Sequence, residues 1–346
     1  MAYPKKGKKK TVIVAMSGGV DSSVAAALLK RAGFDVKGIF MRLCDNVASR
    51  ESEKRAEQTA ELLDIPFRVL NLEKDFKKRV IRYFLREHKK GRTPNPCVIC
   101  NKEIKFGFLL KKSLKADYIA TGHYAIVRKG RLFKAKDKDQ SYFLWMLGRK
   151  ELNRVLFPVG SYSKKEIRKL AKKFGLPAFV APESQEICFI LGTVNEFLAK
   201  HIRQKLGQII SVFPNDQKKK IKHFGLPFYT IGQRKGINLS NGPYWVLDKN
   251  LKRNVLIVTK NEKDLFGKEL KFEKANWISG KPPKFPVELK AKIRYGNKPF
   301  SVVLFPGRAV FKRPQRAITP GQSVVFYKRD ELIGGGFIFS RRDSNI

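Results

Sequence analysis

The chain has few acidic residues for its size. Its 346 residues include 30 Asp and Glu but 73 Lys and Arg, which gives a formal net charge of +43. Such a charge disfavours cationic partners and favours polyanions, with binding that weakens as salt rises. Because the lysines are scattered over the whole chain, a proteome that is basic throughout is the alternative explanation. Charge alone therefore indicates RNA or DNA as a partner without establishing it.

Long apolar runs are also missing. No run approaches the roughly 20 apolar residues of a membrane span, and the N-terminal MAYPKKGKKK is basic without the apolar segment of a signal peptide. We therefore expect a cytoplasmic protein without membrane contact, and a monomer. The hydrophobic content of 42% is enough for packed cores, and the length allows two or three domains.

Cysteine is scarce, with only Cys44, Cys97, Cys100 and Cys188. Four cysteines in a chain of this length do not make the disulfide framework of a secreted protein, so each is catalytic, metal-binding or inert. Cys97 and Cys100 form a C-x-x-C pair, whose ordinary interpretation is structural zinc. Structural zinc usually needs four ligands, and no second C-x-x-C follows, which disfavours that interpretation.

The stretch TVIVAMSGGVDSS, Thr11 to Ser23, predicts a buried strand, a glycine turn and a helix. Adjacent Gly18 and Gly19 permit a sharp turn and leave no side chain to keep an anion away. The serine hydroxyls and the new helix N-terminus favour a phosphate or pyrophosphate. The loop is neither a Walker A loop nor a dinucleotide fingerprint, because both spacings are absent. An ordinary glycine-containing strand–helix turn is the alternative.

Strand and helix patterns alternate through the first half of the chain. Strands are predicted at 35–41, near 67–70 and at 117–121, and helices at about 51–63, 75–88, from 138 onward, and 163–174. Such alternation is typical of a parallel α/β sheet with right-handed crossovers. Ligands of these sheets bind beyond the carboxyl ends of the strands, where Ser17 and Met41 fall. His123, just after such an end, is as readily structural as catalytic.

The stretch GRTPNPCVICNKEIKF carries the C-x-x-C pair. Pro94 and Pro96 hold the chain extended, so a helix can begin only around Cys97. Cys97 and Cys100 then share one face of that helix. A cysteine near a helix N-terminus, with Lys102 and Lys105 nearby, should have its thiolate favoured.

The pattern changes from about residue 194. A helix at 194–205 leads into strands punctuated by Gly and Pro, then a basic cluster made of Lys218, Lys219, Lys220 and Lys222. The following FGLPFYTIGQRKGI interleaves aromatic and basic residues, which suits a surface that holds RNA. Beyond about residue 272, short strands and turns predict a small β-barrel. We expect domains at 1–193, 194–268 and 269–346.

Seven motifs in order carry a resemblance to a known family: SGGVDSS, RTPNPCVICNKEIKF, ATGHYA, KDQSYFL, SQEICFI, TIGQRKGI and TPGQSVVFY. SGGVDSS resembles the PP-loop of the ATP pyrophosphatases, and the set together resembles the tRNA-specific 2-thiouridylases. The resemblance spans about residues 11–339. It implies an α/β PP-loop catalytic domain of the adenine nucleotide alpha hydrolase-like type with a parallel sheet, a small central domain and a C-terminal β-barrel.

The resemblance also implies an activity, the ATP-dependent conversion of a wobble uridine to 2-thiouridine with sulfur from a cysteine persulfide. The oxygen on uridine C2 is a poor leaving group, so ATP adenylates it, releasing pyrophosphate, and AMP departs in its place. The implied partners are tRNAs of the glutamate, glutamine and lysine types and a persulfide donor such as a cysteine desulfurase or a sulfur-relay protein. The implied cofactors are ATP and Mg²⁺, with Asp21 helping to position the metal.

Site residues follow from the same resemblance. Cys188 would carry the persulfide, and Cys100 would resolve it, leaving a Cys100–Cys188 disulfide that must be reduced again. The positions expected to bind ATP are Ala15, Met16, Ser17, Gly18, Gly19, Val20, Asp21, Ser22, Met41 and Gly122. Those expected to face the target base are Asn95, Pro96 and Cys97. Those expected to contact tRNA are Lys138, Asp139, Gln140, Arg294 and Tyr295.

Cys97 departs from the family, some members of which have an aspartate at this position. The substitution creates a set of three thiols, Cys97, Cys100 and Cys188, which could hold a 4Fe–4S cluster that delivers sulfide. The cluster is the alternative to the persulfide and disulfide route, and Cys44 is expected to be structural. Two further alternatives are another PP-loop ATP pyrophosphatase, of the amidating-synthetase or lysidine-synthetase type, and a basic RNA-binding protein without catalysis.

Overall fold

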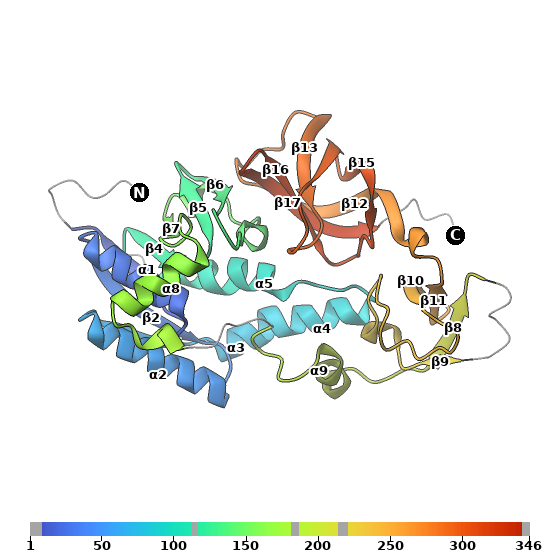
Figure 1. The fold of residues 1–346 in the computed structure, drawn as a ribbon, viewed down its shortest axis with the longest axis horizontal. Coiled ribbons are helices and arrows are strands. Elements are labelled where there is room, and N and C mark those ends of the chain that lie inside the picture. Colours follow the sequence, from blue (N-terminus) through green and yellow to red (C-terminus); the bar gives the residue numbers. More distant parts are fainter. Residues whose placement is uncertain (1–8, 113–115, 181–186, 214–220, 341–346) are drawn as a thin grey trace.

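The computed structural model describes residues 9–112, 116–180, 187–213 and 221–340. It contains a parallel sheet flanked by helices, a small central sheet and a β-barrel (Figure 1). The predicted fold class is therefore confirmed. Ser184 to Glu186 of the SQEICFI motif, and Lys218 to Lys220 of the basic cluster, lie outside the described residues.

The parallel sheet has the strand order β3-β2-β1-β4-β7. Its strands are β1 (Thr11–Ala15), β2 (Asp35–Arg42), β3 (Phe67–Asn71), β4 (Tyr118–Thr121) and β7 (Val155–Leu156). Val12 and Val14 of the central strand are fully buried, as its β-branched run predicts. Ala15 is paired in register with Ile39 of β2 and Thr121 of β4. The carboxyl ends of these strands therefore meet at one edge, where the chain continues into Ser17, Met41 and Gly122.

Helices cover this sheet and extend away from it. They are α1 (Val20–Arg31), α2 (Val47–Leu62), α3 (Glu73–Phe76), α4 (Arg82–Lys89), α5 (Pro96–Ile99), α6 (Gly107–Lys112), α7 (Arg149–Leu152), α8 (Lys164–Lys173) and α9 (Val194–His201). Helix α2 begins earlier than predicted because Asn46 accepts a hydrogen bond from the backbone N of Ser49 and caps it. The capping box of Ser163 and Glu166 begins α8.

Two segments of wider helical turn complete the long helices. One, Lys77–Ile81, joins α3 to α4, and the other, Cys100–Phe106, joins α5 to α6. The helix that carries Cys97 and Cys100 begins at Pro96, close to the predicted start. Proline is favoured at this first helical position because its missing N–H has no helical partner there.

The central sheet has the order β10-β11-β8-β9. Its strands are β8 (Gly207–Ser211), β9 (Lys222–His223), β10 (Trp245–Asn250) and β11 (Val255–Thr259). Its buried residues Val246, Leu256 and Val258 belong to the same hydrophobic cluster as Phe76 and Phe84 of α3 and α4. The central sheet is thus packed against the helical extension of the first sheet.

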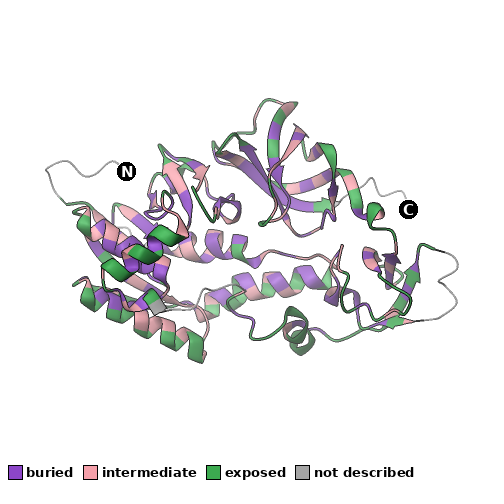
Figure 2. Cartoon of the chain, viewed as in Figure 1, coloured by how far each residue is buried: buried purple, intermediate pink, exposed green. Residues whose placement is uncertain are grey.

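The barrel runs β12-β15-β14-β13-β16-β17 and closes through pairing of β12 with β17. Its strands are β12 (Phe266–Trp277), β13 (Val287–Lys292), β14 (Phe300–Phe305), β15 (Arg308–Arg316), β16 (Ser323–Lys328) and β17 (Glu331–Ser340). Buried residues alternate along β14 and β15, and Figure 2 shows the barrel's buried positions on its strands. A hairpin of β5 (Ala125–Arg128) and β6 (Arg131–Lys134) extends this sheet, with Leu132 paired to Leu332.

The helix predicted from Lys138 onward is wrong. The chain forms only a short 3-10 turn at Ser141–Phe143. Asp139 Oδ1 accepts hydrogen bonds from the backbone N of Ala135 (3.3 Å) and of Ser141 (3.1 Å), which fixes a loop conformation. Trp145 is then fully buried with its indole N–H donated to Ser323 Oγ on the barrel, so tertiary contacts override helix propensity.

In the part of the chain that the structure describes, no helix has the length and apolarity to cross a membrane.

Candidate active site

The loop between β1 and α1 is shaped by its first glycine. Gly18 has φ +71°, and a Cβ there would lie 2.0 Å from the carbonyl oxygen of Ser52 on α2. Only glycine fits this position, because both the backbone angle and the contact forbid a side chain. Gly19 is the N-cap of α1, and no side chain caps the helix. Since the N-cap residue offers no side-chain acceptor, the first N–H groups of α1 suit an anion site.

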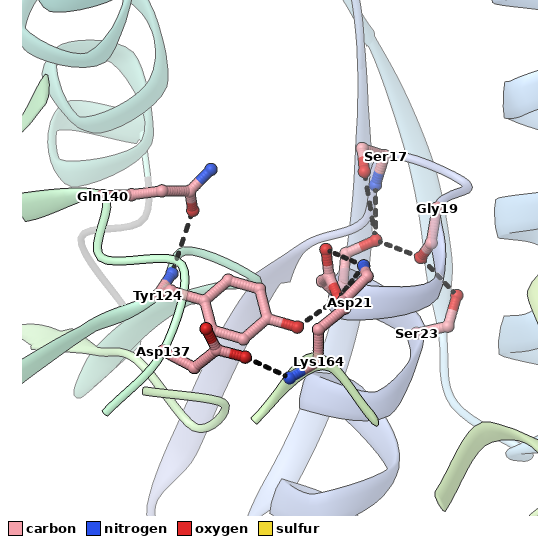
Figure 3. A network of polar contacts seen from close by, with 9 residues as sticks. Ser17, Gly19, Asp21, Ser23, Tyr124, Asp137, Gln140 and Lys164 are labelled. Atoms are coloured by element: carbon pink, nitrogen blue, oxygen red, sulfur yellow. Dashed lines mark hydrogen bonds and ion pairs between the residues drawn. The ribbon is translucent and has the colours of Figure 1, made fainter. Parts of the chain in front are cut away.

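Three serines hold the loop together. Ser22 Oγ accepts a hydrogen bond from the backbone N of Ser17 (3.0 Å), lies 3.1 Å from Ser17 Oγ and donates to Gly19 O (3.0 Å). Ser23 Oγ also donates to Gly19 O, at 3.1 Å. Figure 3 shows this network at the start of α1. The loop is thus held by short-range bonds before any nucleotide arrives.

Asp21 in the first turn of α1 lies in an ion pair. Both of its carboxylate oxygens accept from Lys164 Nζ, at 2.7 and 2.8 Å, and Oδ1 also accepts from Tyr124 OH at 2.7 Å (Figure 3). Lys164 begins α8, and its backbone N donates to Asp137 Oδ2 (3.1 Å). The sequence reasoning missed Lys164, although the Ser163 capping box correctly marked the start of its helix.

Gly122 follows β4 and lies directly against the loop. A Cβ on it would be 2.6 Å from the backbone N of Ser22 and 2.7 Å from the backbone C of Asp21. Three other predicted nucleotide residues, Ala15, Met16 and Val20, have buried side chains that pack into hydrophobic clusters. These three residues can present only their backbones to a nucleotide. Met41 is partly buried and contacts both the cluster of Ala15 and the cluster of Cys100.

The fold brings the cysteines together. Cys100 is buried in a hydrophobic cluster that also contains Phe189, with Cys44 and Ile187 packed against it. Phe189 fixes the segment after Cys188 through edge contacts with Phe76 and Phe84, at ring-centroid distances of 5.6 and 5.5 Å. Cys97 and Cys188 themselves are exposed. Cys44, expected to be structural, thus packs against the cluster that contains Cys100.

Desolvation by the surrounding protein raises the pKa of these thiols. The pKa of the buried Cys100 is raised to about 12, and Lys105 opposes this by lowering it. The pKa values of Cys97 and Cys188 are also raised by desolvation from the protein around them and lowered by Lys105. The expectation that the helix N-terminus and lysines favour the thiolate is therefore wrong for the free protein. The ammonium of Lys102 pairs instead with Glu151 Oε1 at 2.6 Å.

All four cysteines are unbonded thiols, so the predicted Cys100–Cys188 disulfide is not present. Among the described residues, no group of three or more His, Cys, Asp or Glu side chains is arranged to hold a metal ion.

Residues expected to face the target base lie at the start of the cysteine helix. Asn95 is the N-cap of α5, and its side-chain oxygen accepts from the backbone N of Cys97 at 3.1 Å. Pro96 is buried. The helix is joined to the edge of the parallel sheet by Phe106, whose ring lies 6.1 Å from that of His123. Burial lowers the pKa of His123 well below its ordinary value, which favours the neutral imidazole.

Most residues expected to contact tRNA have partners within the protein. Asp139 Oδ2 pairs with Lys292 Nζ of the barrel at 3.2 Å, and Gln140 Oε1 accepts from Tyr124 N at 2.9 Å. Arg294 Nη2 donates to Ile231 O, Ala317 O and Thr319 Oγ1. Tyr295 is partly exposed and stacks on Phe143 with a centroid distance of 4.5 Å, and the side chain of Lys138 is exposed.

Family models match three successive parts of the chain. The tRNA methyl transferase HUP domain matches residues 10–192, the tRNA methyl transferase PRC-barrel domain 195–260, and the Aminomethyltransferase beta-barrel domain 267–338. The tRNA-specific 2-thiouridylase MnmA 2 of Clostridium botulinum (strain Langeland) is 44% identical over 351 residues, with 95% of this chain and 98% of the relative covered. The chain belongs to the tRNA-specific 2-thiouridylase family.

Other 2-thiouridylases match equally well. The MnmA of Syntrophomonas wolfei is 42% identical over 346 residues, covering 95% of this chain and 99% of its own. Among solved structures, the U34-tRNA thiolase NcsA from Methanococcus maripaludis with its 4Fe–4S cluster aligns at 16% identity and TM-score 0.36, covering 54% of this chain and 63% of its own. The resemblance read from the seven motifs is thus confirmed at the level of the family.

Proposed function

We propose that this chain is an ATP-dependent tRNA-uridine 2-sulfurtransferase that converts a wobble uridine to 2-thiouridine. The proposal rests on one observation: an intact PP-loop and the hydrophobic cluster that contains Cys100 both lie at the carboxyl edge of the parallel sheet. Met41 links the two, since it packs against the clusters of both Ala15 and Cys100. Nucleotide activation and sulfur delivery can then act on one base held between them.

In the first step the O2 atom of uridine attacks the α-phosphorus of ATP. One P–O bond forms, another breaks, and pyrophosphate leaves. We assign the phosphates to the backbone N–H groups at the start of α1 and to Ser17 and Ser22, with Gly18, Gly19 and Gly122 giving access. Lys164 lies within reach of the same turn through its pair with Asp21 and would stabilise the charge that develops on the leaving pyrophosphate.

Asp21 fits a role in holding Mg²⁺. Magnesium usually binds through one or two carboxylates together with substrate phosphates, and Asp21 supplies one carboxylate beside the phosphate loop. Its oxygens pair with Lys164 here, so the ammonium would move to the phosphates when Asp21 turns to the metal. When bound, Mg²⁺ would neutralise phosphate charge and orient the pyrophosphate.

In the second step sulfur replaces the activated oxygen. The terminal sulfur of a Cys188 persulfide attacks C2 and loses its proton, the C2–O bond breaks and AMP leaves. Cys100 Sγ then attacks Cys188 Sγ, and the S–S bond breaks as the Cys100 thiol proton passes to the released base. Sulfur thus stays on the base, and a Cys100–Cys188 disulfide forms. An external thiol reduces that disulfide. A persulfide donor of the desulfurase or sulfur-relay type would reload Cys188, which is exposed and therefore accessible.

The substrate would be tRNA of the glutamate, glutamine and lysine types, whose anticodon-loop bases unstack readily. We assign base contacts to Asn95, Pro96 and Cys97, and backbone contacts to Lys138 and Tyr295. Asp139, Gln140 and Arg294 would act mainly by holding the surfaces that carry those contacts, because their side chains already have protein partners. Our proposed domain limits are 1–193, 194–268 and 269–346.

Nucleoside mass spectrometry of tRNA tests the proposal. Unmodified glutamate-type tRNA is incubated anaerobically with ATP, Mg²⁺, a persulfide donor (a cysteine desulfurase with cysteine), a thiol reductant and either the wild type or Cys188→Ser. We expect 2-thiouridine with the wild type and a loss of at least about 100-fold with the variant, because the variant has no sulfur carrier. Cys44→Ser serves as the matched control and should retain activity within about threefold.

Two results would contradict the proposal in different ways. If pyrophosphate is released but neither protein gives a thiolated base, the assigned ATP chemistry would be correct and the assigned substrate wrong. The amidating-synthetase and lysidine-synthetase types would then have to be considered again. Full activity of Cys188→Ser would reject the persulfide route. An iron-free sample of the wild type should remain active, because the persulfide route uses no iron.

A further inference from the structure

The segment that precedes the cysteine helix is held from outside its own domain. Residues 91–95, which we call the strap, run between α4 and the barrel before α5 begins (Figure 1). The backbone N of Thr93 donates to Pro320 O at 2.9 Å, and Thr93 O accepts from Gln322 Nε2 at 2.8 Å. Both backbone groups of Thr93 are thus bonded to the barrel turn at 319–322, which is the TPGQ motif.

This turn lies against the strap more closely than a side chain would allow. Gly321 has φ +94°, and a Cβ there would lie 2.8 Å from the backbone N of Thr93 and 2.9 Å from Arg92 Cβ. Real Cβ atoms do not approach heavy atoms this closely, so the contact depends on glycine. The match between the strap and the barrel turn is therefore specific in both hydrogen bonding and shape.

The same junction includes the central segment. Thr93 Oγ1 lies 3.1 Å from Thr230 Oγ1, and Arg294 Nη2 donates both to Thr319 Oγ1 (2.7 Å) and to Ile231 O (3.3 Å). Thr230 and Ile231 begin the TIGQRKGI motif. Three motifs that are far apart in the sequence thus meet at Thr93, and a shift of the barrel turn would carry the strap with it.

Packing does little to hold the strap on one side. A cavity of about 160 Å³ adjoins it, lined by Tyr83, Arg92, Ile99, Glu273 and Gly321 among others. Arg92 spans this region by pairing with both Glu87 and Glu273. Where side chains do not fill space, directional hydrogen bonds determine where the backbone lies.

We propose that Gln322 is a positioning residue for sulfur transfer: its amide holds Thr93 so that α5 presents Asn95, Cys97 and Cys100 to the target base. The inference rests on the proposed function and deepens it, since it assigns the barrel a role in the chemistry besides any contact with tRNA. A small displacement of the strap would be transmitted to the thiols, because only Pro94 and Asn95 separate Thr93 from α5.

A pair of matched substitutions tests the role of Gln322. Gln322→Met removes the bond to Thr93, and Gln315→Met removes the same kind of bond elsewhere in the barrel, from Gln315 Nε2 to Arg313 O. For Gln322→Met we expect kcat for thiolation to fall about tenfold, with KM for tRNA changed less than twofold. The rate of Cys97 alkylation in the free protein should change at least threefold. Gln315→Met should leave kcat, KM for tRNA and the alkylation rate of Cys97 within twofold of the wild type. Gln322→Lys keeps a hydrogen-bond donor and should recover most of the kcat that Gln322→Met loses.

If Gln322→Met and Gln315→Met lower kcat for thiolation equally, the loss would come from general damage to the barrel, and the proposal would be overturned. An unchanged alkylation rate and kcat in Gln322→Met would also overturn it. If the wild type forms no 2-thiouridine, the proposed function fails, and the alkylation comparison alone then decides whether Gln322 positions the cysteine helix.

Discussion

The phosphate loop and the strap are positioned in opposite ways. The loop is held within its own domain, by bonds of Ser17, Ser22 and Ser23 that span at most five residues and by bonds from Asp21 to Tyr124 and Lys164. The strap is held at Thr93 by bonds to Thr230 and Gln322, which are 137 and 229 residues away. The nucleotide site is therefore built within one domain, whereas the sulfur site takes its geometry from all three parts of the chain. Preorganisation of the second site depends on the whole assembly.

The first prediction tests how far the phosphate loop depends on its own backbone. Gly18→Ala would place a Cβ 2.0 Å from Ser52 O, so the loop must move, and a displacement of about 1 Å at such a site costs on the order of 100-fold in rate. We expect pyrophosphate release to fall by that factor while Cys97 alkylation stays unchanged. Gly33→Ala is the control, because Gly33 also has positive φ (+85°) but has nothing within 4 Å of the new Cβ. If Gly18→Ala and Gly33→Ala reduce pyrophosphate release equally, the cause would be the positive φ that both positions share and not the contact with Ser52.

The second prediction concerns Lys164, the long-range partner of the loop. Lys164→Met removes the ammonium that lies 2.7 Å from Asp21 Oδ1, and we expect pyrophosphate release to fall roughly 10- to 100-fold. Lys165→Met, on the exposed neighbour, should have no effect beyond about twofold. If Lys164→Met slows only thiol alkylation and leaves pyrophosphate release unchanged, Lys164 would act at the sulfur site and not at the nucleotide site.

The third and smallest effect is expected at Lys105, which acts on the cysteine cluster through charge. Lys105 lowers the pKa of Cys97, Cys100 and Cys188, so Lys105→Met should raise all three pKa values further. Less thiolate is then present at any pH below those values, and the profile of Cys97 alkylation against pH should move to higher pH. At pH 8 alkylation and thiolation should slow several-fold.

The control for this prediction is Lys102→Met, which removes a lysine already paired with Glu151. It should leave the pH profile in place. If the pH profile moves equally in Lys105→Met and Lys102→Met, the cause would be a general effect of net charge on the site. If it moves in neither variant, Lys105 would have no role in the thiol chemistry.

The same contrast explains what could be predicted from the sequence. The strand, glycine turn and helix of the phosphate loop, and the capping box at Ser163, are local patterns, and the structure has them where expected. The Thr93 junction, the Lys164–Asp21 pair and the position of Cys44 depend on contacts between distant segments, which no local pattern encodes. The thiol pKa expectation failed for the same reason. Nearby lysines are visible in the sequence, but the burial that outweighs them is not.

The hairpin β5–β6 has a consequence for how the chain is made. Arg131 on β6 binds Glu331 on β17, a partner that emerges from the ribosome 200 residues later. At about 5 to 20 residues per second, the edge of β6 stays unpaired for roughly 10 to 40 seconds during synthesis. Exposed strand edges pair readily with other chains. Arg128, Arg131 and Lys134 place positive charge on this hairpin, and like charges on a second nascent copy would repel it until β17 arrives.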